Sequence, residues 1–456
     1  PADPGGSVLL VLQEAQKAME ASLAGRFNDE IARELTRYWN GRVFYILSPI
    51  PTTLFEGRIG IENKAFSVAR TVFEPKGTKR AKQLTATQGA IWIPAPSILT
   101  VQHGIIEPKT VEQLDHWWTG NGLLQIVDTK KLHENLLSGR AVIVSASNAI
   151  VGFELDPSPQ VRQLLDKDRS RQTFRMSYLA ANGQKVGVKR LVGVDSSLDY
   201  IGARNIAERD APLRGKNIAL LGCGTIGSHL ARYLVQCGAG NNGKLTLVDF
   251  ETMSPGNLGR HILNSSDIGT QKSTALAAEL ERFHPDVSVS SIHGKAQAVW
   301  PRIAEADLVV DATGVENLSE FLNIKAIERR LSGKETAILH AYIWQNGIAV
   351  QTFLNAGNHL ACYRCLKPEQ TWLCDPRKDV KTEARIVLNR CGDGPYLPFS
   401  VSASVSAAGL ALEAILSFFR KEPGPSLRNL ILDSKTAKHL KDSKPRQHER
   451  CPICNL

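Results

Sequence analysis

The chain has 456 residues, of which 43% are hydrophobic and 22% charged, and its formal net charge is +10. This composition excludes an intrinsically disordered protein, and the length suffices for two or three domains that each bury a core. No apolar run approaches the roughly 18–20 residues of a membrane helix, so we expect no membrane association.

The chain begins "PADPGGSVLL", without Met and without the basic region of a signal peptide. We therefore expect a processed chain or a fragment, located in the cytoplasm. The basic residues are scattered and have no interleaved aromatic residues. They predict a solvated basic face or an acidic protein partner rather than a nucleic-acid partner.

Residues 1–199 predict an accessory α+β domain with no recognisable catalytic motif and no cysteine. A helix is expected within residues 27–41, and Trp117 and Trp118 are expected to pack in a core or an interface. Short runs bounded by turn residues predict strands at 42–47, 89–95, 123–127 and 141–147.

Residues 200–456 change to alternating strands and helices, which predicts an α/β fold with a doubly wound, mostly parallel sheet of the Rossmann type. An Asn346-Gly347 pair between two apolar runs predicts a β-hairpin. The expected strands are 216–221, 244–249, 287–292 and 306–314, and the expected helices are 228–238 and 272–285.

A glycine-rich turn joins the first strand of this region to its first helix. Gly222, Gly224 and Gly227 allow a tight turn, a close approach of the backbone to a ligand, and close helix packing. Helix N–H groups would then face an anion. Asp249 ends the second strand, where a carboxylate accepts both ribose hydroxyls. These four residues fit NAD and ATP equally well.

The residues that follow favour a triphosphate. Asn257 and Arg260 come just after Asp249, and a guanidinium offers several donors to phosphate oxygens. Lys272, at the start of a helix, supplies a second cation. Asp311 ends a buried strand, where it would either hold Mg²⁺ between phosphates or cap the next helix.

In this order, "GCGTIG", "VDFE", "GNLGRH", "GTQK" and "VVDATG" resemble the adenylyltransferase superfamily of ubiquitin-activating enzymes and of the bacterial sulfur-carrier activators (ThiF/MoeB-like), over roughly residues 200–456. The resemblance implies ATP-dependent adenylation of the C-terminal glycine of a ubiquitin-like protein. It implies that Asn257, Arg260 and Lys272 stabilise the reacting phosphorus and that Asp311 binds Mg²⁺. Thr225 and His261 stand where sulfur-carrier activators usually have Gly and Gln.

The form "NLGRH" resembles bacterial ubiquitin-like conjugation systems, which are often linked to antiviral defence. The resemblance implies a homodimer and a ubiquitin-conjugating partner enzyme. It also implies an arginine lent to the partner subunit's active site, for which we prefer Arg204 over Arg209.

The eight cysteines all lie from Cys223 onwards, and two pairs are C-x-x-C. Two such pairs complete a closed tetrahedral site, which predicts a structural Zn²⁺ that clamps the C-terminal tail. The expected ligands are Cys362, Cys365, Cys451 and Cys454. Cys223 and Cys237 are expected to be buried and inert.

Cys374 and Cys391 remain as nucleophile candidates. Cys391 precedes a Gly/Pro segment and an Ala/Ser-rich helix, and in this it resembles the crossover-loop cysteine of the family. We therefore expect a thioester on Cys391, followed by transfer to the conjugating enzyme. The alternatives are adenylation alone, a sulfur-carrier activator of the thiamine or molybdopterin type, a non-catalytic scaffold, and an NAD-dependent oxidoreductase.

Overall fold

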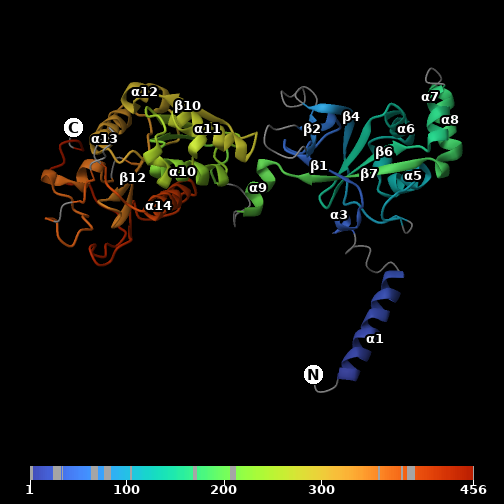
Figure 1. Cartoon of the computed structure of the whole chain (residues 1–456), viewed down its shortest axis with the longest axis horizontal. Helices are drawn as coiled ribbons and strands as arrows, with labels where there is room; N and C mark the ends of the chain where they lie inside the picture. Colours follow the sequence, from blue (N-terminus) through green and yellow to red (C-terminus); the bar gives the residue numbers. More distant parts are fainter. Residues whose placement is uncertain are drawn as a thin grey trace. The chain divides into compact units, whose positions relative to one another are not determined.

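The chain divides into two compact units, Pro1–Ser197 and Leu198–Leu456 (Figure 1). The expected boundary between residues 199 and 200 falls inside the first helix of the second unit, α9 (Leu198–Asn205). The computed structural model describes residues 4–23, 32, 34–62, 70–75, 84–102, 105–167, 172–205, 212–357, 360–381, 384–387 and 396–454.

The described strands of the first unit form a closed barrel in the order β1-β3-β2-β4-β5-β6-β7. Parallel pairing of β1 with β7, from Arg42 opposite Leu191, closes it. Phe44, Trp92 and Ile143 are among the side chains that fill one of its cores. The strands are β1 (Arg42–Ile46), β2 (Phe55–Glu62), β3 (Arg70–Pro75), β4 (Thr85–Pro94), β5 (Ala141–Ser145), β6 (Ile150–Asp156) and β7 (Gly187–Asp195).

Helices accompany this barrel, so the α+β class expected for the first unit is confirmed. Trp117 and Trp118 lie fully buried on α5 and belong to a core shared with the strands. The helices are α1 (Pro4–Leu23), α3 (Leu35–Tyr38), α5 (Val111–Gly120), α6 (Thr129–Leu137), α7 (Pro159–Lys167) and α8 (Gln172–Asn182).

The expected strand at 123–127 and the expected helix within 27–41 differ from the structure or lie partly outside its described residues. The strand expected at 123–127 is wrong, because Leu123–Gln125 forms a short 3₁₀ helix directly after α5. A short apolar run does not reveal its own period, so a strand and a buried turn of helix look alike in sequence. Of the helix expected within 27–41, Leu35–Tyr38 forms the short helix α3, whereas residues 27–31 and 33 lie outside the described residues.

The second unit contains one seven-stranded sheet in the order β10-β9-β8-β11-β12-β13-β14. The strands from β10 to β12 pair in parallel, and β13 and β14 are antiparallel additions. The strands are β8 (Asn217–Leu221), β9 (Lys244–Asp249), β10 (Val289–His293), β11 (Leu308–Asp311), β12 (Ile338–Trp344), β13 (Ala349–Asn355) and β14 (Leu427–Ile431).

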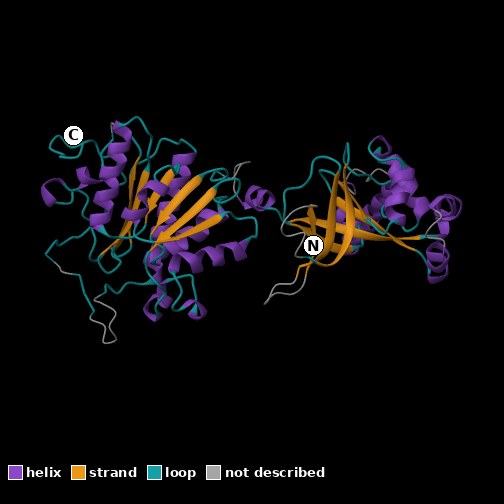
Figure 2. Ribbon diagram, turned by 90° about the horizontal axis from the view of Figure 1, so that it is seen from above, coloured by secondary structure: helices purple, strands orange, loops and turns teal. Residues whose placement is uncertain are grey.

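Helices cover both faces of this sheet (Figure 2), which confirms the doubly wound α/β fold. Alternate residues of β8 enter two different cores: Ile218 and Leu220 face α10, α11 and α14, whereas Ala219 and Leu221 face α12 and α13. The helices are α10 (Thr225–Gln236), α11 (Lys272–Phe283), α12 (Ala296–Ile303), α13 (Glu316–Leu331) and α14 (Val401–Phe419).

One helix of the described chain, α14, is long and apolar enough to cross a membrane by length and composition alone. The expectation that no run reaches this length was therefore too strict. An alanine-rich face of α14, including Ala407 and Ala411, is buried in the core beside β12, β13 and α10. The helix thus packs as a core helix of the sheet.

The turn between β8 and α10 depends on the close approach of Gly227 to the backbone of Gly222. A Cβ atom built on Gly227 would lie 1.8 Å from the carbonyl oxygen of Gly222. A Cβ atom on Gly224, in the same turn, would meet nothing within 4 Å. Gly227 therefore sets the spacing between the helix and the strand, whereas Gly224 does not.

We predict that Gly227→Ala lowers the free energy of unfolding of the second unit by about 2 kcal/mol or more, because the turn must shift to admit the methyl group. Gly224→Ala is the matched control and should change it by less than about 0.5 kcal/mol. Urea unfolding followed by circular dichroism measures both. Equal stability of the two variants would contradict the role given to Gly227.

Candidate functional site

A cavity of about 460 Å³ lies at the carboxyl ends of β8, β9 and β11. In an open α/β sheet this is where ligands bind, next to the point where the strand order reverses. Of the residues expected to bind nucleotide, the cavity brings together all but Gly227 and Asp311. The residues that line the cavity together are Gly222, Gly224, Asp249, Asn257, Arg260 and Lys272.

Asp249 is held at the cavity wall by the backbone. One carboxylate oxygen accepts the N–H of Cys223 at 2.6 Å, and the other accepts the N–H of Glu251 at 2.7 Å. Burial raises the pKa of Asp249, and the two backbone donors and Lys272 oppose that rise. Because a carboxylate has about four acceptor positions, the fixed side chain can still accept further hydroxyl donors.

Three basic side chains line the cavity, and the two that the sequence predicted, Arg260 and Lys272, are both engaged. Arg260 donates to the carbonyl oxygen of Leu397 at 3.2 Å, and its guanidinium lies 4.3 Å from the ring centre of Phe399. Lys272 is buried and forms a 2.5 Å ion pair with Glu251. Their positive charge is thus held in place at the carboxyl edge of the sheet, where an anionic ligand would lie.

Asn257 is fixed by its own turn. Its side-chain oxygen accepts from both the backbone N–H and the hydroxyl of Ser254, at 3.0 and 3.1 Å. The amide group is therefore oriented with its oxygen turned to the protein, which leaves its NH₂ group as the donor for a ligand.

The two residues noted as departures from the sulfur-carrier activators have structural roles. Buried His261 donates through Nε2 to the carbonyl of Cys223 at 2.6 Å and accepts the N–H of Leu263 at Nδ1. Both bonds require the neutral ring, and burial lowers the pKa of His261 accordingly. Thr225 contacts the hydroxyl of Ser404 and donates to the carbonyl oxygen of Arg260, which ties the turn to α14.

The sequence did not predict the end of the cavity that lies beside Phe250. It is lined by side chains from three separate segments, which no local motif connects. Phe250 directly follows Asp249, and Lys295 lies 6.0 Å from its ring centre. The other residues at this end are Gly294, Ala296, Gln297, Val315 and Leu318.

Asp311 does not fit the Mg²⁺ site expected of it. Its carboxylate accepts four hydrogen bonds: two from Thr313, one from Ser319 at 2.5 Å and one from His340 at 2.9 Å. These donors fill its acceptor positions, and the side chain is only 2% exposed. Burial by itself raises the pKa of Asp311, but the hydrogen bonds outweigh it and hold the pKa below the usual value. Asp311 lines a second, smaller cavity instead.

Arg204 lies exposed near the end of α9 and donates to the hydroxyl of Tyr200 at 3.0 Å. The alternative, Arg209, lies outside the described residues. Nothing in the described second unit brings Arg204 to the 460 Å³ cavity of its own chain.

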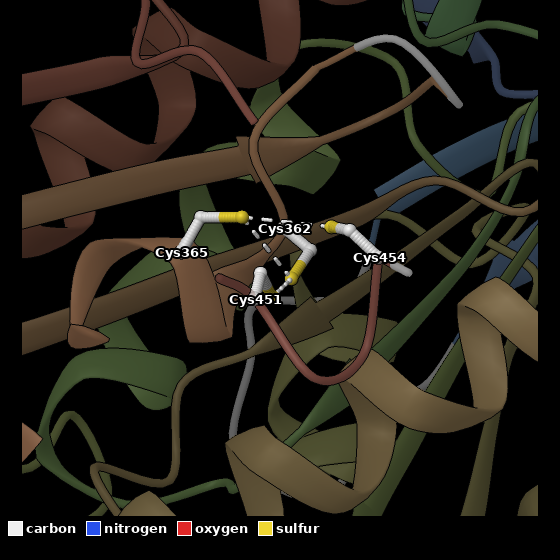
Figure 3. A group of neighbouring side chains, drawn as sticks. All are labelled: Cys362, Cys365, Cys451 and Cys454. Carbon is white, nitrogen blue, oxygen red and sulfur yellow. Dashed lines mark hydrogen bonds between the residues drawn. The ribbon is translucent and has the colours of Figure 1, made fainter. Parts of the chain in front are cut away.

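Four cysteines converge as expected for a metal site (Figure 3). The Sγ atom of Cys362 lies 3.7 Å from that of Cys365 and 3.6 Å from that of Cys451. The Sγ atom of Cys365 lies 3.5 Å from that of Cys454. Tetrahedral Zn²⁺ with bonds of about 2.3 Å requires sulfur separations of about 3.8 Å. The donor set and the spacing therefore fit a closed structural Zn²⁺ site.

The remaining thiols differ in accessibility. Burial raises the pKa of Cys223, Cys237 and Cys374, so a smaller fraction of each thiol is present as the nucleophilic thiolate. Cys374 is half-buried. Cys391 lies outside the described residues, so its role stays a prediction.

We predict that the purified chain holds one Zn²⁺ and that a Cys451→Ser/Cys454→Ser variant holds none. Loss of the clamp should lower the thermal unfolding midpoint by roughly 5–10 °C. Metal analysis by mass spectrometry and a thermal melt measure this. Cys237→Ser, which removes a thiol outside the cluster, should retain the metal; a metal-free wild-type chain of full stability would contradict the site.

Comparison with known proteins places this site in a family. The chain is 28% identical to the "ATP-dependent ubiquitin transferase-like protein Cap2" of Pseudomonas aeruginosa, over 99% of this chain and 82% of that protein. It is 31% identical to the protein of the same name from Escherichia coli, but the match covers 59% of this chain and less than half (45%) of that protein.

Among solved structures, Escherichia coli MccB with ATP aligns with a TM-score of 0.42 and 18% identity, covering 65% of this chain and 85% of that one. Residues 202–453, more than half of the chain, match the ThiF family. The chain therefore belongs to the ThiF family.

Proposed function

We propose that the second unit binds ATP and adenylates the C-terminal glycine of a ubiquitin-like protein. The observation that carries this is one cavity in which a glycine turn, a fixed carboxylate and the cations Arg260 and Lys272 meet. The glycine turn and the N-terminus of α10 would receive phosphates, and Asp249 would accept the ribose hydroxyls. The end beside Phe250, Val315 and Leu318 would hold the adenine base.

The proposed chemistry needs positive charge at the phosphates. The glycine carboxylate attacks the α-phosphorus of ATP, the bond to pyrophosphate breaks, and an acyl-adenylate forms. Negative charge develops on the phosphate oxygens, and Arg260, Lys272 and the NH₂ group of Asn257 are the donors at hand. Asp311 does not fit as a ligand of Mg²⁺, so it has no role in this step.

In the second proposed step, a thiolate of Cys391 attacks the acyl carbon and AMP leaves with the bonding electrons. The described flanks of the segment that carries Cys391 support this choice. Val387 and Tyr396 pair through two backbone hydrogen bonds of 3.0 and 3.1 Å. Asn346 bonds Arg385 and Pro398 on the two sides of that pair. Both flanks are thus anchored to the β12–β13 hairpin.

The flank that follows the Cys391 segment reaches the 460 Å³ cavity, because Leu397 and Phe399 contact Arg260. The relatives named Cap2 support a ubiquitin-like substrate, and we extend the proposal to a conjugating enzyme as the next acceptor. A homodimer would present the exposed Arg204 to the partner subunit's site. Cytoplasmic location and a role in antiviral defence belong to the same proposal.

We predict that Arg260→Ala lowers ATP–pyrophosphate exchange by about 100-fold or more, because it removes a cation from the developing charge. The assay uses a ubiquitin-like protein encoded beside this chain, with a Gly-Gly end. Arg282→Ala is the matched control, since Arg282 is exposed on α11 and pairs only with Glu279 among described residues. Exchange by Arg260→Ala within threefold of wild type would refute the assignment.

We predict that Cys391→Ser retains exchange but loses the adduct that a thiol reductant removes on a gel. Cys374→Ser should retain both exchange and adduct. An adduct in Cys391→Ser that a thiol reductant still removes would rule out Cys391 as the nucleophile, since an ester on the new serine would resist the reductant. A thiocarboxylate product without any adduct would instead favour a sulfur-carrier activator.

A further inference from the structure

A metal site made of four cysteines carries more charge than its ion cancels. Four thiolates around one Zn²⁺ leave a surplus of two negative charges. The cysteine cluster lies in an apolar core with Phe353, Leu366 and Leu427, where unbalanced charge is costly. The backbone N–H of His448 donates to Sγ of Cys365 at 3.3 Å, but one neutral donor does not balance this surplus. The site therefore needs further donors or a cation close to its sulfur atoms.

One face of α13 lies along the cysteine cluster. Asn323, Ile327 and Arg330 are spaced by four and three residues, so their side chains lie on the same side of the helix. Ile327 packs in the core that contains the cysteines. The side-chain oxygen of Asn323 accepts the N–H of Tyr363, which directly follows Cys362 in the chain, at 2.9 Å. Asn323 and Arg330 thus lie on the helix face that is turned to the expected metal ligands.

Both of these side chains carry a buried donor without an acceptor. Within the described residues, Nδ2 of Asn323 and Nε of Arg330 are buried and have no hydrogen-bond partner, which is rare in folded proteins. Asn355 joins the two side chains, because it donates to Oδ1 of Asn323 at 2.9 Å and accepts from Arg330 at 2.8 Å. Since Oδ1 of Asn323 already accepts from Asn355 and Tyr363, the NH₂ group of this amide remains to donate elsewhere.

Electrostatic effects connect both donors to the sulfur atoms of the cluster. The neighbouring Cys365 and burial raise the pKa of Cys362, whereas Asn323 lowers it. The Asn323 amide therefore favours the thiolate, which only its NH₂ end can do. Burial lowers the pKa of Arg330, and the thiols of Cys362 and Cys454 oppose that lowering. Both donors gain most when a metal ion converts the thiols to thiolates.

Other cations beside the first cysteine pair in the chain already have carboxylate partners. Arg364 pairs with Glu320 at 2.7 Å, and Lys367 pairs with Glu316. Within the part of the chain that the structure describes, Arg330 forms no ion pair, and its hydrogen bond goes to a neutral amide. The charge of Arg330 is therefore available to the metal site.

We propose that Asn323 and Arg330 balance the charge of the four-cysteine metal site and that Asn355 holds both of them in place. The NH₂ group of Asn323 donates to the Cys362 thiolate, and the guanidinium of Arg330 offsets the surplus negative charge. These are positioning residues, since they act on the sulfur atoms and not on the metal ion. Their role does not depend on the proposed adenylation.

The test is the affinity of the full chain for Zn²⁺, measured by competition with a chromogenic chelator. Arg330→Met removes the charge but keeps an apolar stem, and it should weaken Zn²⁺ binding about 10–100-fold, as is typical of residues that support metal ligands. Arg330→Lys keeps the charge and should recover most of this loss. Arg329→Met is the matched control and should bind as wild type does, because Arg329 bonds Thr336 and Glu305 instead.

Thermal melts with and without metal separate charge balance from packing. Zn²⁺ binding releases protons from the cysteines, so the metal-free chain has less negative charge for Arg330 to balance. Arg330→Met should therefore lower the unfolding midpoint of the Zn²⁺-loaded chain by several degrees more than that of the chelator-treated chain. A packing role alone would lower both midpoints equally.

Co²⁺ in place of Zn²⁺ reports on the sulfur atoms directly. Removal of a donor or of a nearby positive charge raises the energy of the sulfur electrons. Asn323→Leu and Arg330→Met should therefore each shift the sulfur-to-Co²⁺ charge-transfer band to longer wavelength, whereas Arg329→Met should leave the band in place.

Zn²⁺ affinity of Arg330→Met within about threefold of wild type would overturn the inference. Equal weakening by Arg330→Lys and Arg330→Met, equal destabilisation with and without metal, or an unmoved Co²⁺ band in both variants would overturn it as well. If Asn323→Leu does not fold, Arg330→Met decides the question. A chain that binds neither Zn²⁺ nor Co²⁺ would reject the network together with the metal site.

Discussion

The second unit depends on the parallel pairing of β8 with β11, which sets Leu221 opposite Asp311. The strand order reverses at this pair, so the chain segments that follow the two strands diverge around a cavity. One segment is the glycine turn into α10 and the other is the turn from Asp311 to Gly314. Without this register, neither segment would reach the 460 Å³ cavity or the smaller cavity beside it.

Charge balance then determines how the site can be used. Three charged groups at the sheet edge already have partners: Lys272 has Glu251, Arg260 has the flank containing Leu397 and Phe399, and Asp249 has backbone N–H donors. Buried charge is tolerated only when it is paired in this way. The contact of Arg260 also links this cavity to the flank of the segment that carries Cys391.

Much of this second unit was readable from the sequence, because its elements are periodic and its turns carry glycine. The strands at 217–221 and 244–249, the hairpin at Asn346-Gly347 and the convergence of four cysteines were all expected and are present. The barrel closure of the first unit was not, since β1 pairs with β3 and β7 from distant parts of the chain. The segment at Leu123–Gln125 was predicted wrongly because so short a run of residues shows no period.

By itself, the sequence determined the fold class of the second unit, the glycine turn and the four cysteines that converge, because each is encoded by local spacing of residue types. Only the tertiary structure decided what Asp311 does. Its four hydrogen-bond donors come from residues 313, 319 and 340, which parallel pairing of β11 with β12 and the packing of α13 bring together. A carboxylate at a strand end looks the same in sequence whether it faces a metal or a histidine, since its partners lie far along the chain.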